Sequence, residues 1–231
     1  MKNLLEKMAQ AQKQNQAFNI VAVGDSVTNG SFRDDKDFEC VWHARLRRLL
    51  NGIFPDLRIN MINSGIDGDN AAGVLRRMEE DVLCYRPGLV ILCIGLNDIT
   101  APAEKFLGTV SQIAARVAQS GADLIYLTPN CTVSRVQEEE IRKLFGADWA
   151  VELAHGLAER QNSGVTDTFF EKAAKSAAAA GAVVCDAYRA WKALSEAGVD
   201  TTKLLANGIN HPTREMHAVF AALLLETILL K

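Results

Sequence analysis

Short runs of apolar residues alternate along the chain with longer segments whose apolar residues recur every three or four positions. The short runs are typical of strands that are covered on both faces of a parallel sheet, and the 3–4 spacing is typical of amphipathic helices. The predicted strands are Asn19–Val23, Ile59–Asn63, Leu89–Ile94, Leu124–Leu127 and Val183–Cys185. The predicted helices are Glu39–Leu50, Asn70–Cys84, Ala103–Gln119, Thr166–Ala180 and Thr213–Leu230. This repeated order predicts an α/β fold around a parallel sheet.

The domain organisation follows from length and from the segments outside this alternation. The 231 residues contain no internal repeat and no low-complexity linker, so we expect one domain over 1–231. An amphipathic helix is expected over about 1–16. A helical insertion is expected over about 131–164, where Glu138 and Arg142 form a favourable i,i+4 pair. The insertion is either a cap over a functional site or a surface addition.

Composition and charge narrow the function classes. Apolar residues make up 48% and charged residues 23%, as in ordinary globular proteins, and a net charge of −3 argues against non-specific nucleic-acid binding. The five cysteines form no C-x-x-C pair, which favours buried thiols in a reducing compartment. No apolar run resembles a secretory signal or crosses a bilayer, so we expect a cytoplasmic protein without membrane contact. The sequence leaves the oligomeric state open.

Glycines and small polar residues follow the predicted strands directly. Ser26 lies in Gly24-Asp25-Ser26 after the first strand, and Asn97 follows the third. In open α/β sheets, ligands bind beyond the carboxyl ends of the strands. We therefore expect a polar, backbone-rich crevice at this edge. Asp25 and Asp98 are interpreted as braces of the adjoining turns.

Ser26 and His211 are the candidate catalytic pair. A serine nucleophile needs a base that takes its proton, and His211 stands in a loop before the last helix, followed by Pro212. The other histidines have simpler interpretations as structural or exposed side chains: His43, His155 and His217.

Acyl transfer also needs donors for the developing oxyanion. The candidates are the backbone N–H groups of Ser26 and Gly65 and the side-chain amide of Asn97. Gly65 lacks a side chain, so a substrate can approach its backbone. The chain has no H-E-x-x-H, no metal-type Cys/His spacing and no G-x-S-x-G elbow, so we expect neither a metal nor an organic cofactor.

Four blocks of the sequence resemble those of the SGNH (GDSL-type) hydrolases. They are Gly24-Asp25-Ser26, Gly65 in N-S-G-I-D-G, Gly95-Leu96-Asn97-Asp98 and His211-Pro212. The resemblance spans roughly residues 20–230. It implies a three-layer α/β/α sandwich with a flavodoxin-like parallel sheet of about five strands. It also implies a Ser26 nucleophile, a His211 base, and an oxyanion hole of Ser26, Gly65 and Asn97.

The chain departs from the family pattern before the histidine. The family usually has an Asp about three residues before it, whereas this chain has Asn207-Gly208-Ile209-Asn210 and no carboxylate between Lys203 and Glu215. An Asn oxygen can orient the imidazole but cannot offset an imidazolium charge. We expect a Ser–His dyad whose ring is oriented by Asn207 or by a backbone carbonyl.

The leading hypothesis is a serine esterase, similar to the lipases and acetylesterases of the family, that acts on small acyl esters. The four blocks, an aromatic content of only 6% and the lack of an extended apolar lid in the sequence favour acetyl as the acyl group and a carbohydrate as one candidate alcohol, with short-chain thioesters and lysolipids left open. The alternative is a catalytically weak or inactive SGNH-fold binding module, motivated by the missing Asp. A phosphate or nucleotide binder has little support, since the loop 24–30 lacks both G-x-G-x-x-G and a Gly-Lys-Ser/Thr ending.

Overall fold

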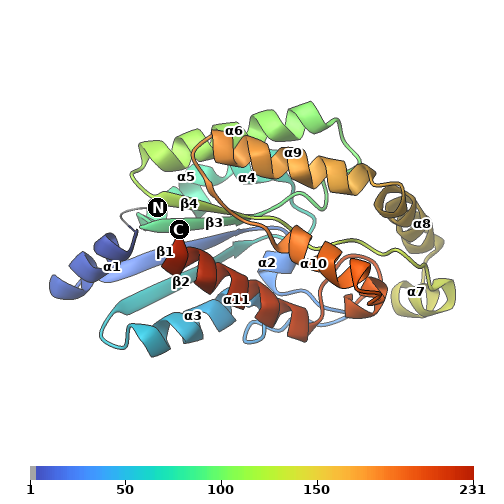
Figure 1. Ribbon diagram of the computed structural model, residues 1–231, viewed down its shortest axis with the longest axis horizontal. Helices are drawn as coiled ribbons and strands as arrows, with labels where there is room; N and C mark the ends of the chain where they lie inside the picture. Colours follow the sequence, from blue (N-terminus) through green and yellow to red (C-terminus); the bar gives the residue numbers. More distant parts are fainter. Residues whose placement is uncertain (1–3) are drawn as a thin grey trace.

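A five-stranded parallel sheet forms the centre of the molecule in our computed structural model, which describes residues 4–231 (Figure 1). The strand order is β2-β1-β3-β4-β5, so the first strand lies inside the sheet and the chain winds outward in both directions. The strands are β1 Ala17–Gly24, β2 Arg58–Gly65, β3 Leu89–Cys93, β4 Asp123–Leu127 and β5 Val183–Cys185. The predicted parallel sheet of about five strands is confirmed.

Helices cover both faces of the sheet and make three layers (Figure 1). On one face, α3 Trp42–Ile53 packs against α11 Arg214–Leu230, and α1 Leu4–Lys13 contacts β1 and α11. On the other face, α6 Ala103–Gln119 packs against α9 Val165–Ala179 and α4 Ala71–Arg76. None of the helices within residues 4–231 is long and apolar enough to cross a bilayer. The predicted N-terminal helix also included residues 1–3, which lie outside the described residues.

The central strands could be predicted from their apolar residues because they are buried. All five residues of β3 are buried, and β1 is buried from Ile20 onward, as expected for strands with helices on both faces. The edge strand β2 is more exposed and keeps several polar residues. The helical faces contribute the remaining core, including the fully buried Trp42 and Trp191.

Two helical predictions need correction. The segment predicted as one helix over Asn70–Cys84 is divided into α4, α5 Met78–Asp81 and the 3-10 turn η1 Leu83–Tyr85. The break falls at Arg77, whose guanidinium bonds to groups at the strand ends. The apolar spacing could not reveal this, since it continues across the break. A further helix, α10 Ala187–Glu196, was not predicted; Asp186 caps its start by accepting the Arg189 N–H at 3.1 Å.

The remaining elements lie around the carboxyl ends of the strands. They are α2 Ser26–Asn29, α7 Glu138–Phe145, α8 Asp148–Asn162 and the 3-10 turn η2 Thr201–Leu204. In Figure 1, α7 and α8 lie together at the right end of the molecule, beyond the sheet. Both fall in the segment expected to be a helical insertion.

Candidate active site

Ser26 and His211 meet at the carboxyl edge of the sheet. Asp25 ends the turn after β1 by accepting the Val27 N–H at 3.0 Å, and this N-cap places Ser26 at the start of α2. The Ser26 Oγ lies 2.9 Å from Nε2 of His211, although 185 positions separate the two residues. This distance is within reach for direct proton transfer.

A backbone carbonyl fixes the tautomer of the His211 ring. The Nδ1 atom lies 2.8 Å from the carbonyl oxygen of Phe32. A carbonyl can only accept, so Nδ1 carries the proton in the neutral ring and Nε2 presents its lone pair to the Ser26 hydroxyl. Burial lowers the pKa of His211 below its ordinary 6.5, against the opposing effect of the Phe32 hydrogen bond. At neutral pH the ring is therefore a free base directed at Ser26.

Asn207 does not orient the ring, which corrects one of the two options given by the sequence. Its Oδ1 accepts three backbone N–H groups, from Ile209, Asn210 and His211, at 3.0, 2.9 and 2.9 Å. The side chain thus closes the loop that carries the histidine. The physical reason is that the Asn207 oxygen is already occupied by backbone donors. The backbone-carbonyl option is the one observed, and no side-chain pattern could have pointed to Phe32.

The loop that carries Phe32 is held by Arg214 at the start of α11. The Arg214 Nε donates to Asp37 at 2.8 Å, and a second nitrogen of the same guanidinium pairs with Asp35. The guanidinium carbon also lies 4.5 Å from the centre of the Phe32 ring. The Arg214 side chain therefore contacts the loop at Asp35, Asp37 and the Phe32 ring, around the carbonyl that contacts His211.

A cavity of about 560 Å³ opens over the pair. One wall is apolar and comes from α7, α8 and the His211 loop, and the other is polar. The apolar wall contains Phe145, Trp149, Leu153 and Ile209. The polar wall contains Ser31, Arg33, Asp34, Asp35, Lys36, Asp67, Gly68, Asn97, Asn207 and Asn210. The volume suits a small-molecule substrate.

Asn97 is one of the predicted oxyanion donors that the structure brings to the cavity. Its Nδ2 donates to the backbone oxygen of Asp69 at 2.8 Å. A side-chain amide has two N–H groups, so this bond orients the amide and leaves the second donor for a substrate oxygen.

Gly65 is not placed as predicted. Its N–H donates to Oδ1 of Asn63 at 3.0 Å, and a Cβ built on it would lie 2.3 Å from the Asn29 backbone nitrogen. Gly65 lets β2 approach α2 and does not line the cavity. Gly68, three residues later in the same N-S-G-I-D-G block, does line it, with a φ of +75°. The second glycine of the block was the available signal in the sequence.

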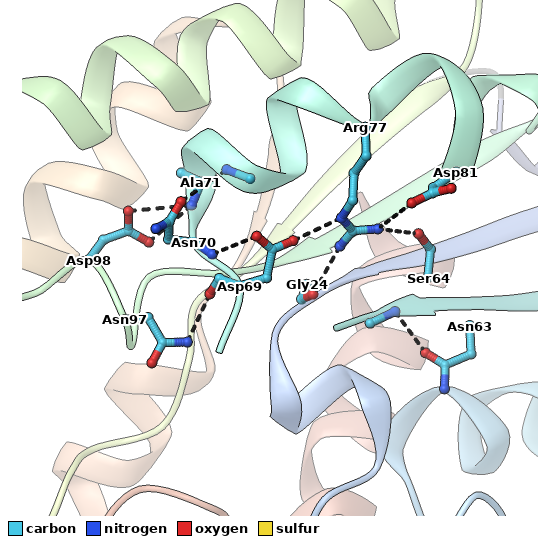
Figure 2. A network of polar contacts seen from close by, with 12 residues as sticks. Gly24, Asn63, Ser64, Asp69, Asn70, Ala71, Arg77, Asp81, Asn97 and Asp98 are labelled. Atoms are coloured by element: carbon cyan, nitrogen blue, oxygen red, sulfur yellow. Dashed lines mark hydrogen bonds and ion pairs between the residues drawn. The ribbon is translucent and has the colours of Figure 1, made fainter. Parts of the chain in front are cut away.

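A buried ion pair between Arg77 and Asp69 connects the loop after β2 to Gly24, at the end of β1 (Figure 2). Arg77 and Asp69 pair at 2.8 Å with side chains only 13% and 11% exposed. The same guanidinium donates to Ser64 Oγ at 2.7 Å and to the Gly24 carbonyl at 3.2 Å. The backbone oxygen of Asp69 also accepts from Asn97. One hydrogen-bond network therefore sets the position of the turn that carries Ser26 relative to the Asn97 amide.

The other acidic groups of the motifs act as braces. Asp98 accepts the Ala71 N–H at 3.2 Å, and burial raises its pKa to about 6. Asp25 is almost fully buried, and burial raises its pKa to about 7. Among residues 4–231, no group of three His, Cys, Asp or Glu side chains is arranged to hold a metal ion.

The remaining histidines contact groups other than Ser26 and His211. His43 contacts the Thr28 carbonyl at 3.0 Å, and His217 accepts the Trp42 N–H at 3.1 Å, both in buried positions. His155 pairs with Glu138 on the surface and joins α7 to α8.

The chain matches known proteins over most of its length. The sequence model of the GDSL-like lipase/acylhydrolase family matches residues 22–219. An acetylxylan esterase of Geobacillus stearothermophilus is 33% identical over 86 residues, which are 35% of this chain and 39% of that protein. The match therefore spans about two fifths of the relative's length.

Solved structures share the fold at low sequence identity. The crystal structure of Axe2, an acetylxylan esterase of Geobacillus stearothermophilus, gives a TM-score of 0.70 at 18% identity, covering 93% of this chain and 95% of that one. LAE5, an alpha/beta hydrolase from the metagenome of Lake Arreo, Spain, gives 0.68 at 21% identity, covering 92% and 96%. These similarities confirm the predicted three-layer architecture.

Proposed function

The chain belongs to the GDSL-like lipase/acylhydrolase family and has the SGNH hydrolase fold, and we propose that it is a serine esterase that hydrolyses small acyl esters. One observation carries the proposal: the hydrogen-bonded series from Ser26 Oγ through His211 to the Phe32 carbonyl. The similarity to an acetylxylan esterase supports acetyl as the acyl group and a carbohydrate as the alcohol.

In the proposed first step, the Ser26 oxygen attacks the ester carbonyl carbon while its proton moves to Nε2 of His211. The carbonyl π electrons move to the oxygen, and that oxyanion accepts from the second N–H of Asn97 and from the backbone amides of Ser26 and Gly68. The tetrahedral intermediate then collapses, the C–O bond to the alcohol breaks, and His211 returns the proton to the leaving oxygen.

The second half of the reaction repeats these transfers with water. His211 takes a proton from a water molecule, whose oxygen attacks the acyl carbon of the acyl-enzyme. Collapse of the second intermediate breaks the bond to Ser26, which recovers its proton, and releases the carboxylic acid. The serine and the histidine thereby return to their starting protonation states.

The alternative function is an inactive binding module on the same scaffold. The observation that favours it is the absence of a carboxylate on His211, whose Nδ1 contacts a neutral carbonyl. Against it stands the directed lone pair at Nε2, which a module without chemistry does not require.

The test is hydrolysis of p-nitrophenyl acetate together with labelling by a fluorophosphonate, which reacts only with an activated serine. We expect Ser26→Ala and His211→Ala each to lower kcat/KM by at least about a thousandfold, and the double variant to be no slower than the slower single variant. Labelling should be stoichiometric in the wild type and lost in Ser26→Ala.

Ser120→Ala is the matched control. Ser120 is an exposed serine just before β4, at the opposite edge of the sheet, so its removal should leave labelling and rate unchanged. A wild type that neither reacts with the probe nor exceeds the Ser26→Ala rate would overturn the esterase proposal and favour the binding-module alternative.

A further inference from the structure

The helices α7 and α8 give the cavity an aromatic wall. Phe145 ends α7, Gly146 turns the chain with a φ of +65°, and Trp149 lies in the first turn of α8. The rings of Phe145 and Trp149 are 5.7 Å apart at an angle of 64°. Leu153 follows Trp149 by four residues, so both side chains lie on the same face of α8 and line the cavity.

The position of this wall is set by α8, whose Ala150 and Ala154 are completely buried in the core, and two surface ion pairs join α8 to α7. Arg142 of α7 contacts Asp148 of α8 at 3.1 Å, and Glu138 of α7 contacts His155 of α8 at 2.8 Å. The two pairs bridge the helices at different heights. Trp149 is thus presented by a fixed element and not by a loop alone.

Trp149 is exposed in a way that the other tryptophans are not. Its side chain is 58% exposed, whereas Trp42 and Trp191 are completely buried. The fold does not need this ring for its core, and the ring borders the cavity that contains Ser26 and His211. A large apolar face left in water beside a reactive group is typical of a ligand-binding surface.

The polar wall shows what kind of ligand fits. Asp34, Asp35 and Asp67 line the cavity beside Lys36 and Asn210, with Asp67 paired to Lys36 at 3.0 Å and Asp35 paired to Arg214. An acyl chain of a lipid would remove water from these polar groups without offering them hydrogen-bond partners. A sugar ring has both required surfaces, since its C–H face packs on an aromatic ring and its hydroxyls bond to carboxylates and amides.

We propose that Trp149, supported by Phe145, is the platform that binds the sugar ring of an O-acetylated pyranoside, with the acetyl group directed at Ser26. This assignment rests on the proposed esterase function and adds the residue that selects the alcohol. Trp149 is a specificity residue, because it contacts the leaving alcohol and no atom that changes its bonds.

The binding test uses intrinsic fluorescence, for which the chain is well suited. Ser26→Ala protein is titrated with an acetylated xylo-oligosaccharide, so that the ligand binds without turnover. We expect a saturable blue shift of emission as Trp149 leaves water, with no shift in Ser26→Ala/Trp149→Phe, whose remaining tryptophans are buried. Equal shifts in both proteins, or none in either, would overturn the proposal.

The kinetic test compares two acetyl esters of different alcohols. In Trp149→Ala, the ratio of kcat/KM for the acetylated xylo-oligosaccharide to that for p-nitrophenyl acetate should fall about tenfold, mainly through KM. Trp149→Phe keeps a ring and should recover part of the ratio. Tyr85→Ala, which removes an exposed aromatic residue from η1, is the matched control and should keep the wild-type ratio.

The two proposals fail in different ways. If p-nitrophenyl acetate is not hydrolysed in a Ser26-dependent manner, the esterase function is wrong. If it is hydrolysed but the ratio does not change in Trp149→Ala, the esterase function stands and the sugar platform is wrong. Circular dichroism melts of each variant confirm that the compared proteins are folded.

Discussion

The carbonyl oxygen of Phe32 lies 2.8 Å from Nδ1 of His211, although Phe32 precedes His211 by 179 positions in the chain. A carbonyl accepts the ring N–H as a carboxylate does, and it therefore selects the same tautomer. Unlike a carboxylate, it carries no net charge to stabilise an imidazolium ion. In this molecule the group that orients the His211 base does not compensate the positive charge that the base gains during the reaction.

The pH dependence of the rate should reflect this separation. Burial lowers the pKa of His211, and only the neutral ring can accept the Ser26 proton. We therefore expect kcat/KM to rise with pH through an inflection below 6.5 and to be flat from pH 7 to 8. Initial rates with an acetyl ester from pH 4.5 to 8 measure this pH dependence of kcat/KM. An inflection above 7 would indicate a charged partner on the ring.

Arg214 should act on catalysis through Phe32. Removing the guanidinium in Arg214→Ala frees the loop that holds the carbonyl, so we expect kcat to fall about tenfold or more with little change in KM. Arg214→Lys keeps the charge and one hydrogen bond and should fall between. The inflection of the pH profile should also move, which a general loss of folded protein would not cause.

Asn207 offers a direct test of how the histidine loop is built. Asn207→Asp keeps the oxygen that accepts three backbone N–H groups, so kcat should stay within a fewfold of wild type. Asn207→Ala leaves these buried donors unpaired and should cost about 1–3 kcal/mol of stability. Urea unfolding and steady-state kinetics measure both effects. A large rate gain in Asn207→Asp would mean that residue 207 reaches the ring after all.

The sheet, the main helices and the Ser26–His211 pair could be predicted because each leaves a side-chain pattern. Strand β3 is continuously apolar, and the residues after each strand are small and polar. The break at Arg77 could not be predicted, because the apolar spacing continues across it and the Arg77 contacts with Gly24 and Ser64 form only in the folded chain.

The site's details depended on backbone groups, which the sequence does not distinguish. The carbonyl of Phe32 is chemically the same as every other carbonyl, and only folding brings it to His211. The exchange of Gly65 for Gly68 has a similar origin. Both glycines occupy one short block: Gly65 ends β2 opposite Gly24, whereas Gly68, in the turn that follows, lines the cavity.

Those two glycines should respond differently to alanine. A Cβ at Gly65 meets the backbone of α2, so Gly65→Ala should lower the melting temperature by several degrees. A Cβ at Gly68 would meet no atom within 4 Å, but the φ of +75° makes alanine unfavourable by about 1 kcal/mol and would change the direction of the amide. We expect Gly68→Ala to lower kcat with a small change in stability. Equal stability losses in the two variants would contradict the assignment.

Asp25 should make the folded state less stable as the pH rises. Its pKa is about 7 in the folded chain and 3.8 as the ordinary value, because burial disfavours the charged carboxylate. The unfolded chain therefore releases this proton first, so the stability that the neutral group supports is present below about pH 4, declines up to about pH 7 and is constant above it. Three pKa units correspond to at most about 4 kcal/mol.

Asn keeps the acceptor for the Val27 N–H without a charge, so Asp25→Asn should be more stable than wild type at pH 8 and nearly equal at pH 4.5. Urea unfolding at both pH values measures the difference, with the exposed Asp56→Asn as the control that should keep the wild-type pH dependence. A destabilised Asp25→Asn at pH 8 would show that the charged carboxylate has a stabilising partner in the folded protein.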